Sequence, residues 1–417
     1  MCVERGRPRS IAIPSLPVVS APLKGLQRVR ILEVEYLGPP AMGGVELLVE
    51  ALHRKFTGAG HEVEIWCSDL AGFDGSRLAP GHAEVNGMRV RRFPTRRVRP
   101  WIFDPHHLVW CGLRQALIEA AGQGAVLHVH SFPSDQVLKS LSAMAAGGRV
   151  VITPHHDTES LRRYLRLWRA QVICRRLVRM ARRHPRVSLT VHTPAARDLW
   201  VNEIGWPEAQ VRVIPNGVDL EEFDRVTPAE IDAATRYWPG CDLRVLFVGR
   251  LARSKGVDTL LRALARVPGV GLLVIGPDAG AREELDRLRH ELNLEERAVF
   301  ATMPRRELCA AFRACDLFVL PSRFGENFGI AAVEAMAARK PILVSDRGGL
   351  PSLAESGRNG LVFTAESVES LADALARLAA SEELRRQLGE AGRAAVEARY
   401  TWDHVARAYL DLFAAVK

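Results

Sequence analysis

The chain has 417 residues, of which 47% are hydrophobic and 25% charged, and its formal net charge is +9. These proportions exclude a disordered or low-complexity chain, and the length predicts two or three globular domains. No stretch approaches about 18 uncharged apolar residues, so no transmembrane helix is predicted, and the basic balance favours an anionic partner such as phosphate, nucleic acid or a membrane surface.

Residues 1–27 are predicted to form a disordered tail rather than a signal peptide, because Pro14, Pro17 and Pro22 break the short apolar run that they contain. The seven cysteines are scattered and odd in number. This pattern favours reduced thiols over a disulfide framework, and therefore a cytoplasmic location.

Strands and helices are predicted to alternate in the first half of the chain. A helix is expected from residue 45 to about residue 57, and further helix-like segments separate most of the strands. The expected strands are 28–36, 61–68, 125–131, 149–155 and 188–193. This order indicates βαβ units and a parallel sheet.

The same alternation begins again near residue 243, after a turn-rich segment at 211–223. The expected strands are 243–250, 271–277, 298–303, 316–322 and 341–346, with a helix at 257–267 after the first. The boundary is placed at 214/215, which gives α/β domains at 28–214 and 215–398. Two Rossmann-like domains are therefore expected to face each other across a cleft, where ligands of such sheets bind.

The segment RFGENFGIAAVEAMA, residues 323–337, follows a predicted strand and leads into a helix. The free backbone N–H groups from Asn327 to Ile330 favour an anion such as phosphate, and glycines at 325 and 329 allow its close approach. Glu326 and Glu334 lie at the two ends of this unit, and a carboxylate accepts two hydroxyl hydrogen bonds, which suits a sugar or ribose. The alternative for Glu334 is a salt-bridged surface residue.

Two glycine-containing loops complete the predicted site. Arg250 and Lys255 flank the loop that follows strand 243–250, where two cations suit a diphosphate, although a solvated basic loop is the alternative. Gly43 and Gly44 open the first helix and are candidates for lining the cleft near a phosphate or sugar. A simple turn is the alternative there.

Histidines gather at the ends of two strands. His128 and His130 lie on one face of strand 125–131, and His155 and His156 end the next strand. A histidine at a strand's carboxyl end can bond a hydroxyl or take part in proton transfer, whereas His128 is expected to be a packed structural residue. The spacing matches no zinc motif and the chain has no D-x-D sequence, so no metal site is predicted.

Taken together, these motifs resemble those of the retaining glycosyltransferases of family 4, also described as group 1, which have the two-domain GT-B fold. The resemblance spans about residues 28–417. It is carried by IPNGVD (214–219), VGRLARSKG (248–256), the Glu326…Glu334 unit, GGLPSLAESGRNGLVF (348–363) and, in the first half, PPAMGGVE and HVHS. It implies metal-independent transfer of a hexose-type sugar from a UDP- or GDP-linked donor, with no other cofactor, to a glycan or lipid-linked acceptor.

The resemblance also implies a role for each motif residue. The C-terminal domain holds the donor, the N-terminal domain binds the acceptor, and the helix at 399–417 packs back onto the N-terminal domain. Arg250 and Lys255 hold the diphosphate, Glu326 bonds the transferred sugar and His130 lines its site. The remaining donor contacts are Gly44, Asn327, Phe328, Gly329 and, at the ribose, Glu334; the acceptor contacts are Gly43 and His155. Arg339, Ser352 and GPDAG (276–280) depart from the family pattern, which leaves the sugar and nucleobase open.

A basic stretch suggests a further partner. Residues 161–197 contain eleven arginines and no acidic residue, and 161–183 is predicted to be one helix with Leu161, Tyr164, Leu165, Trp168 and Val172 on a shared side. Residues 89–103 add six arginines, with Trp101 and Phe103 nearby. Such a surface can bind anionic lipid at the inner face of a membrane. The alternative is a solvated cationic surface whose apolar side lies in the core; a nucleic-acid partner is not expected, because no known binding module accompanies the charge.

Two other functions remain open from the sequence. One is a GT-B-like epimerase or phosphorylase, although no motif for a pyridoxal lysine is evident. The other is a catalytically silent partner subunit of the same fold, which would not need to keep Arg250, Lys255, Glu326 and Glu334.

Overall fold

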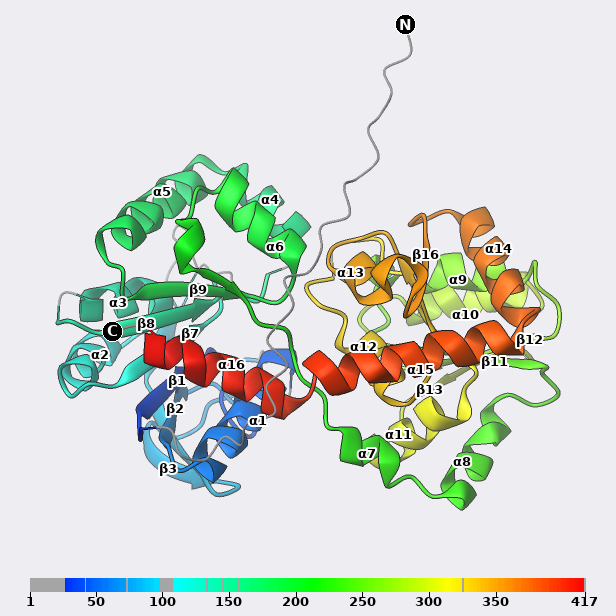
Figure 1. Ribbon diagram of the computed structural model, residues 1–417, viewed down its shortest axis with the longest axis horizontal. Helices are drawn as coiled ribbons and strands as arrows, with labels where there is room; N and C mark the ends of the chain where they lie inside the picture. The colour runs from blue at the N-terminus through cyan, green and yellow to red at the C-terminus, as the bar shows by residue number, and fades with distance from the viewer. Residues whose placement is uncertain are drawn as a thin grey trace, which may run out of the picture.

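The chain folds into two lobes, each built around its own β-sheet with helices on both faces (Figure 1). The computed structural model describes residues 27–415, except residues 42, 73, 98–107, 133, 145, 157 and 325. The predicted tail therefore lies almost entirely outside the described residues, as do Trp101, Phe103 and Gly325.

The N-terminal lobe contains an eight-stranded sheet in the order β10-β9-β8-β7-β1-β2-β4-β3. Its neighbouring strands are parallel, except for the antiparallel pair β3 and β4. The strands are β1 (Arg30–Val34), β2 (Glu62–Ser68), β3 (Gly81–Val85), β4 (Met88–Phe93), β7 (Val126–His130), β8 (Arg149–Thr153), β9 (Val187–Val191) and β10 (Val211–Val213), with a separate pair β5 (Thr95–Arg97) and β6 (Leu108–Trp110). The helices are α1 (Gly44–Gly58), α2 (Leu113–Gly122), α3 (Asp135–Met144), α4 (Thr158–Leu165), α5 (Trp168–Arg183) and α6 (Pro194–Asp198).

The C-terminal lobe contains a six-stranded, entirely parallel sheet in the order β13-β12-β11-β14-β15-β16. This is the strand order of a Rossmann fold, with its switch point between β11 and β14. The strands are β11 (Leu243–Val248), β12 (Val270–Ile275), β13 (Ala298–Ala301), β14 (Leu317–Leu320), β15 (Ile342–Ser345) and β16 (Gly360–Phe363). Its helices are α7 (Leu220–Asp224), α8 (Pro228–Ala234), α9 (Val257–Leu264), α10 (Arg282–Glu291), α11 (Arg305–Ala314), α12 (Ile330–Ala337), α13 (Leu350–Ala354), α14 (Val368–Ala379) and α15 (Glu382–Arg399). The last helix, α16 (Trp402–Ala415), returns to the N-terminal lobe.

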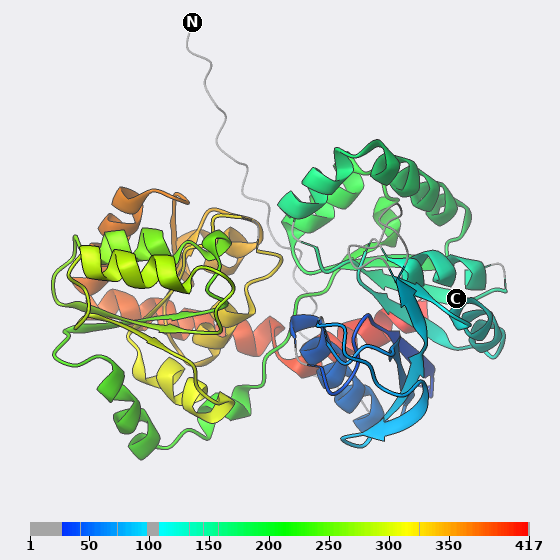
Figure 2. The same cartoon turned by 180° about the vertical axis from the view of Figure 1, so that it is seen from behind.

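The sequence predicts these sheets because their strands are continuous apolar runs, as expected for parallel strands covered on both faces. All four residues of β14 and all four of β15 are buried, for example. The predicted architecture of two Rossmann-like domains is confirmed. Figure 2 shows the two sheets, with their covering helices, from behind.

The chain crosses between the lobes twice, and the two crossings lie side by side. The first crossing is the segment that follows β10, and the second leads from α15 into α16. The Val218 N–H donates to the Tyr400 carbonyl at 2.8 Å, and a Cβ on Gly217 would lie 2.5 Å from the Trp402 ring. This close approach requires glycine at position 217 and forms the hinge between the lobes.

Helix α16 belongs to the C-terminal end of the chain but completes the core of the N-terminal lobe. It packs against α1, and Figure 1 shows it in red across the first sheet. Tyr409 and Phe413 are fully buried there, in one cluster with Ile31 and Phe56. The apolar face of α16 is therefore covered by the lobe in which the chain begins.

The single helix predicted over 161–183 is wrong. The chain forms α4 and α5 with a turn between them, in which Arg166 and Leu167 donate backbone hydrogen bonds to Arg163 and Tyr164. The predicted shared apolar side is lost at this turn, because Leu161 is buried whereas the side chain of Trp168 is 68% exposed. None of the described helices is both long and apolar enough to cross a bilayer.

Candidate functional site

Two loops of the C-terminal lobe meet at the switch point of its sheet. The loop after β11 carries Arg250 and Lys255, and the loop after β14 carries Glu326. Gly256, at φ +69°, brings them together, because a Cβ at this position would lie only 2.1 Å from the Pro321 carbonyl oxygen. The Arg323 N–H also donates to the Ser254 carbonyl at 2.8 Å. The contact between these loops is therefore made by backbone atoms.

Lys255 and Glu326 form an ion pair where these loops meet. The Ser322 hydroxyl donates to the same Glu326 carboxylate oxygen at 3.0 Å. Both charged side chains are about one-fifth exposed, at 22% for Lys255 and 17% for Glu326. The sequence placed these two residues in one site, and the structure brings them together.

Arg250 lies beside this pair along the chain and has an exposed side chain. Among the described residues, no carboxylate forms an ion pair with it. Two hydrogen bonds of 2.9 Å fix the backbone at this position. The Ala252 N–H donates to the Arg250 carbonyl, and the N–H of the next residue, Leu251, donates to the Pro277 carbonyl. Its guanidinium is therefore available to an anion, whereas Lys255 would have to leave Glu326 to bind one.

The segment before α12 packs against the hinge. Gly329 caps α12 at φ +89°, and Phe328 is buried against Tyr400, with ring centroids 5.8 Å apart. The side chain of Asn327 is half-buried, and the backbone carbonyl oxygen of Asn327 lies 3.0 Å from the position that a Cβ on Gly349 would take. Phe328 and Gly329 can thus offer backbone N–H groups to a ligand, but the Phe328 ring belongs to the core.

Glu334 lies in the middle of α12 and is 9% exposed. It forms an ion pair with Arg305, the first residue of α11, at 2.5 Å. Arg305 also binds Glu222 at 2.5 Å, so one guanidinium bridges two carboxylates. Burial raises the pKa of Glu334, and the positive charge and hydrogen bond of Arg305 oppose that rise. One carboxylate oxygen of Glu334 is therefore used within the protein.

The N-terminal lobe contributes the start of α1. Gly43 is the N-cap in an extended conformation, and Gly44 is the exposed first residue, with open space around the position of its missing Cβ. Glu35 is buried nearby, with both carboxylate oxygens lacking a hydrogen-bond partner among the described residues. Burial and the neighbouring Glu46 raise the pKa of Glu35 well above its usual value.

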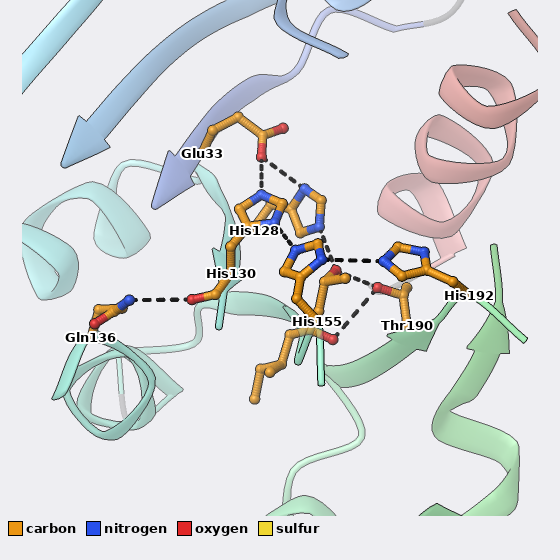
Figure 3. A network of polar contacts seen from close by, with 9 residues as sticks. Glu33, His128, His130, Gln136, His155, Thr190 and His192 are labelled. Atoms are coloured by element: carbon orange, nitrogen blue, oxygen red, sulfur yellow. Dashed lines mark hydrogen bonds and ion pairs between the residues drawn. The ribbon is translucent and has the colours of Figure 1, made fainter. Parts of the chain in front are cut away.

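Histidines follow three neighbouring strands of this lobe and contact one another in a row (Figure 3). His130 Nδ1 lies 2.8 Å from His155 Nε2, and His155 Nδ1 lies 3.2 Å from His192 Nε2. At one end, His192 Nδ1 lies 2.9 Å from the Ile214 carbonyl; at the other, His130 Nε2 lies 2.8 Å from Glu33. We refer to these contacts, from Ile214 to Glu33, as the histidine chain.

His128 is fully buried beside the histidine chain, as the sequence predicts for a packed residue. Its Nδ1 lies 2.8 Å from Glu33, and its Nε2 lies 2.8 Å from the Thr153 hydroxyl. Burial alone would raise the pKa of Glu33, but the charges and hydrogen bonds of His128 and His130 outweigh it and lower the pKa to about 2. His130 and His155, predicted for the sugar and acceptor sites, are thus bonded to each other.

Glu33, His128 and His130 form the group among the described residues whose ligand atoms converge closely enough for a metal ion. All three are fully buried, and both imidazoles already point a ring nitrogen at the same carboxylate oxygen at hydrogen-bond distance. The two imidazoles thus already occupy the carboxylate oxygen that a metal ion would use, and we assign no metal to the group.

The two lobes touch near the histidine chain. His192 lies beside Phe328, with ring centroids 6.4 Å apart, and a Cβ on Gly349 would lie 2.3 Å from the Thr193 side chain. Arg163 of α4 stacks over the Phe324 ring at 4.6 Å. The segment before α12, which carries Phe328, therefore lies against the histidine chain of the other lobe.

Three residues that contact the predicted site residues were missed by sequence reasoning. Glu33 gave a signal, because a charged residue is unusual inside an apolar strand. His192 gave one too, as the third histidine at the end of a predicted strand. Arg305 gave none, because it follows Pro304 at the start of an ordinary helix and its partners are distant in the sequence.

Comparisons with known proteins match both lobes. The model of the Glycosyltransferase Family 4 matches residues 42–222, and the model of the Glycosyl transferases group 1 matches residues 235–395. The two matches do not overlap and together span most of the chain.

Individual relatives agree with these models. A D-inositol 3-phosphate glycosyltransferase of Xylanimonas cellulosilytica is 34% identical over 49% of this chain, and the match covers 51% of that protein, about half its length. A GDP-mannose-dependent alpha-(1-6)-phosphatidylinositol monomannoside mannosyltransferase of Mycobacterium tuberculosis is 27% identical over 92% of this chain and 97% of its own. Among solved structures, Anabaena HepE in complex with UDP superposes with a TM-score of 0.75 at 19% identity, over 93% of this chain and all of that one, which shows a shared fold.

Proposed function

Because the chain belongs to the glycosyltransferases of group 1 and family 4, we propose that it is a retaining hexosyltransferase that needs no bound metal ion. Its donor is a UDP- or GDP-linked sugar, and its acceptor is a hydroxyl of a glycan or of a lipid-linked glycan. The observation that carries this proposal is the Lys255–Glu326 ion pair at the switch point of the donor sheet. A cation for a diphosphate and an acid for sugar hydroxyls lie there in one place.

Donor binding exchanges the partners of this pair. In the free chain, Lys255 and Glu326 neutralise each other. A diphosphate carries more charge than one carboxylate and takes Lys255, helped by the exposed guanidinium of Arg250. Glu326 is then free to accept hydrogen bonds from the sugar hydroxyls, while Ser322 keeps its carboxylate in place.

The same groups stabilise the transition state. When the anomeric C–O bond breaks, negative charge develops on the departing diphosphate, and Arg250, Lys255 and the backbone N–H groups before α12 stabilise it electrostatically. The bond to the acceptor oxygen forms on the same face, and the acceptor proton passes to the departing phosphate. The products are the glycosylated acceptor and the nucleoside diphosphate, with the anomeric configuration retained.

Glu334 binds the ribose of the donor in this proposal. Arg305 holds one of its oxygens and opposes the rise in pKa that burial causes, which leaves the second oxygen for a ribose hydroxyl. A charge-assisted hydrogen bond of this kind contributes more than a neutral one. Arg305 is therefore a positioning residue for the nucleoside end of the donor.

Transfer and its loss on substitution test the proposal. The purified chain is incubated with UDP- and GDP-sugars; one donor is expected to raise the melting temperature and to support transfer. Glu326→Ala is expected to abolish transfer, whereas Glu283→Ala, which alters a 96% exposed side chain on α10, should leave it unchanged. Full transfer by Glu326→Ala, or an inverted anomer in the product, would contradict the proposal.

The acceptor is proposed to bind at the N-terminal lobe, through the loop of Gly43 and Gly44 and through His155. A lipid-linked acceptor is supported by the mycobacterial relative, whose name gives a phosphatidylinositol mannoside as its substrate. The lobe also presents Leu167, Trp168 and Val172 as exposed apolar side chains among the arginines of α4 and α5. We propose that this surface rests on the anionic inner face of a membrane.

Vesicle binding tests the membrane part separately. The chain is expected to co-sediment with anionic vesicles at low salt and less at high salt. Trp168→Ser should weaken binding by about 10-fold or more, since burying a large apolar side chain contributes about 1.5–3 kcal/mol. The control is Val362→Ser, which alters a 40% exposed apolar residue on the other lobe. Failure of the unmodified chain to bind anionic vesicles at low salt would refute the proposal that this surface binds a membrane.

A further inference from the structure

The histidine chain is more extensive than contact of one histidine with a sugar requires. His130 is the last residue of β7, whereas His155 and His192 follow β8 and β9; these three strands are neighbours in the sheet, so the histidines gather at one edge of it. Ring centroids lie 5.1 Å apart for His130 and His155, which are stacked, and 5.2 Å apart for His155 and His192, which are tilted by 35°. The row ends on an oxygen at each side, and this fixes its protons.

Proton positions follow from these two ends. The Ile214 carbonyl can only accept, so His192 Nδ1 carries a proton and donates to it. If each ring is neutral, His192 Nε2 then accepts from His155, and His155 Nε2 accepts from His130. His130 Nε2 would then be a bare acceptor facing the Glu33 carboxylate, another acceptor, at 2.8 Å.

Four contacts therefore need four protons, and three neutral imidazoles supply three. Glu33 keeps His128 Nδ1 at 2.8 Å from the same oxygen, but His130 Nε2 would be left as a buried acceptor facing a carboxylate, which is costly. A fourth proton removes the conflict. This proton can reside on any of the three rings. When the proton within one His–His contact moves from one nitrogen to the other, the positive charge passes to the neighbouring ring and no heavy atom moves.

Neighbouring groups act on this proton in both directions. Burial opposes it: it lowers the pKa of His130 and of His192 to about 4 and, together with the neighbouring histidines, the pKa of His155 well below its usual value. Glu33 favours it, since an adjacent carboxylate stabilises an imidazolium. The other titratable groups that face the histidine chain are His128 on β7, His156 beside His155, His53 on α1, Glu35 after β1 and Tyr409 on α16.

We propose that the histidine chain holds one proton more than three neutral imidazoles and shares it between Glu33 and His192. Glu33 and His192 are then positioning residues, which lock the tautomers of His130 and His155 at the site. The function of the shared proton rests on the proposed transferase activity: it moves away from Glu33 toward the negative charge that develops on the departing diphosphate. The chain thereby gives the N-terminal lobe a cation that can respond to the reaction.

Histidine side-chain nitrogen-15 spectra of the whole chain test the proton count directly, without any donor. At about pH 7.5, above the ordinary histidine pKa of about 6.5, we expect one ring of the three to carry protons on both nitrogens. His192→Asn assigns the signals, because it removes one ring. Three neutral rings at this pH would overturn the proposal, and so would a divalent metal ion bound at one equivalent.

Glu33→Gln is the matched substitution, since an amide keeps the shape and supplies the missing proton to His130 Nε2 from its own NH2 group. All three rings are then expected to be neutral, and kcat to fall by about 10-fold, less than the ~10²–10³ for losing a donor that touches the reacting atoms. The exposed His82→Gln is the control. If Glu33→Gln does not fold, the spectrum of the unmodified chain still decides; if no donor is found, the proposed function fails while the proton count stands.

Discussion

Replacing Gly256 with alanine should separate the two charged loops of the donor site. A Cβ at this position would lie 2.1 Å from the Pro321 carbonyl oxygen, about 0.9 Å inside the 3.0 Å below which Cβ contacts are essentially never found. Backbone atoms cannot rotate away as a side chain can, so one loop must move by about 1 Å. Lys255 and Glu326 lie on these loops, and a 1 Å misplacement of catalytic groups costs about 10²-fold in rate.

The φ of +69° adds strain of its own, of about 1–3 kcal/mol for a residue other than glycine. We therefore expect Gly256→Ala to lower kcat/KM about 100-fold and the free energy of unfolding by at least this strain, measured by steady-state transfer and denaturant titration. Gly240→Ala is the control, because Gly240 has φ +64° but nothing within 4 Å of its Cβ position. If both variants lose equal stability and keep equal activity, the proposed contact between the loops does not position the charges.

Three further substitutions probe other contacts. Arg305→Ala should raise the donor KM by about 10–100-fold, since a charge-assisted hydrogen bond to Glu334 contributes about 1.5–3 kcal/mol. Without Arg305 the pKa of Glu334 rises further, so the acid limb of the pH profile of kcat/KM should move to higher pH. The control variant Arg306→Ala should leave that limb in place. Phe413→Ala should lower the free energy of unfolding by about 3–5 kcal/mol, since its ring is fully buried, and a loss below 1 kcal/mol in a denaturant titration would show that α16 is not part of the core. Gly217→Ala should change kcat and KM together, because a Cβ there meets a ring across the hinge; unchanged kinetics and an unchanged radius of gyration would refute this.

Much of the donor site could be predicted because it depends on sheet topology. Ligand-binding residues of parallel strands gather at one edge, so Lys255 after β11 and Glu326 after β14 were expected to be neighbours. Hydrophobic runs specify those strands directly. What the runs do not specify is which charges pair: Glu334 was expected to face a ligand, and its partner Arg305 comes from a helix 29 residues away.

One wrong prediction and one incomplete prediction in the first lobe have a different origin. The break between α4 and α5 falls at Arg166 and Leu167, where neither proline nor glycine interrupts the helical pattern, so packing rather than local preference ends the helix. The histidine chain was recognised in part, through His130 and His155. Glu33 and His192 also belong to it. Their contacts follow from the order of strands in the sheet, which cannot be read from the sequence.

The return of α16 to the first lobe has a consequence during synthesis. Ile31 and Phe56 emerge from the ribosome before the second lobe, but residues that cover them, such as Tyr409 and Phe413, emerge after it. The second lobe has a complete core of its own and can form meanwhile. The nascent first lobe therefore exposes an apolar surface until α16 has been synthesised, which is the kind of surface that chaperones bind.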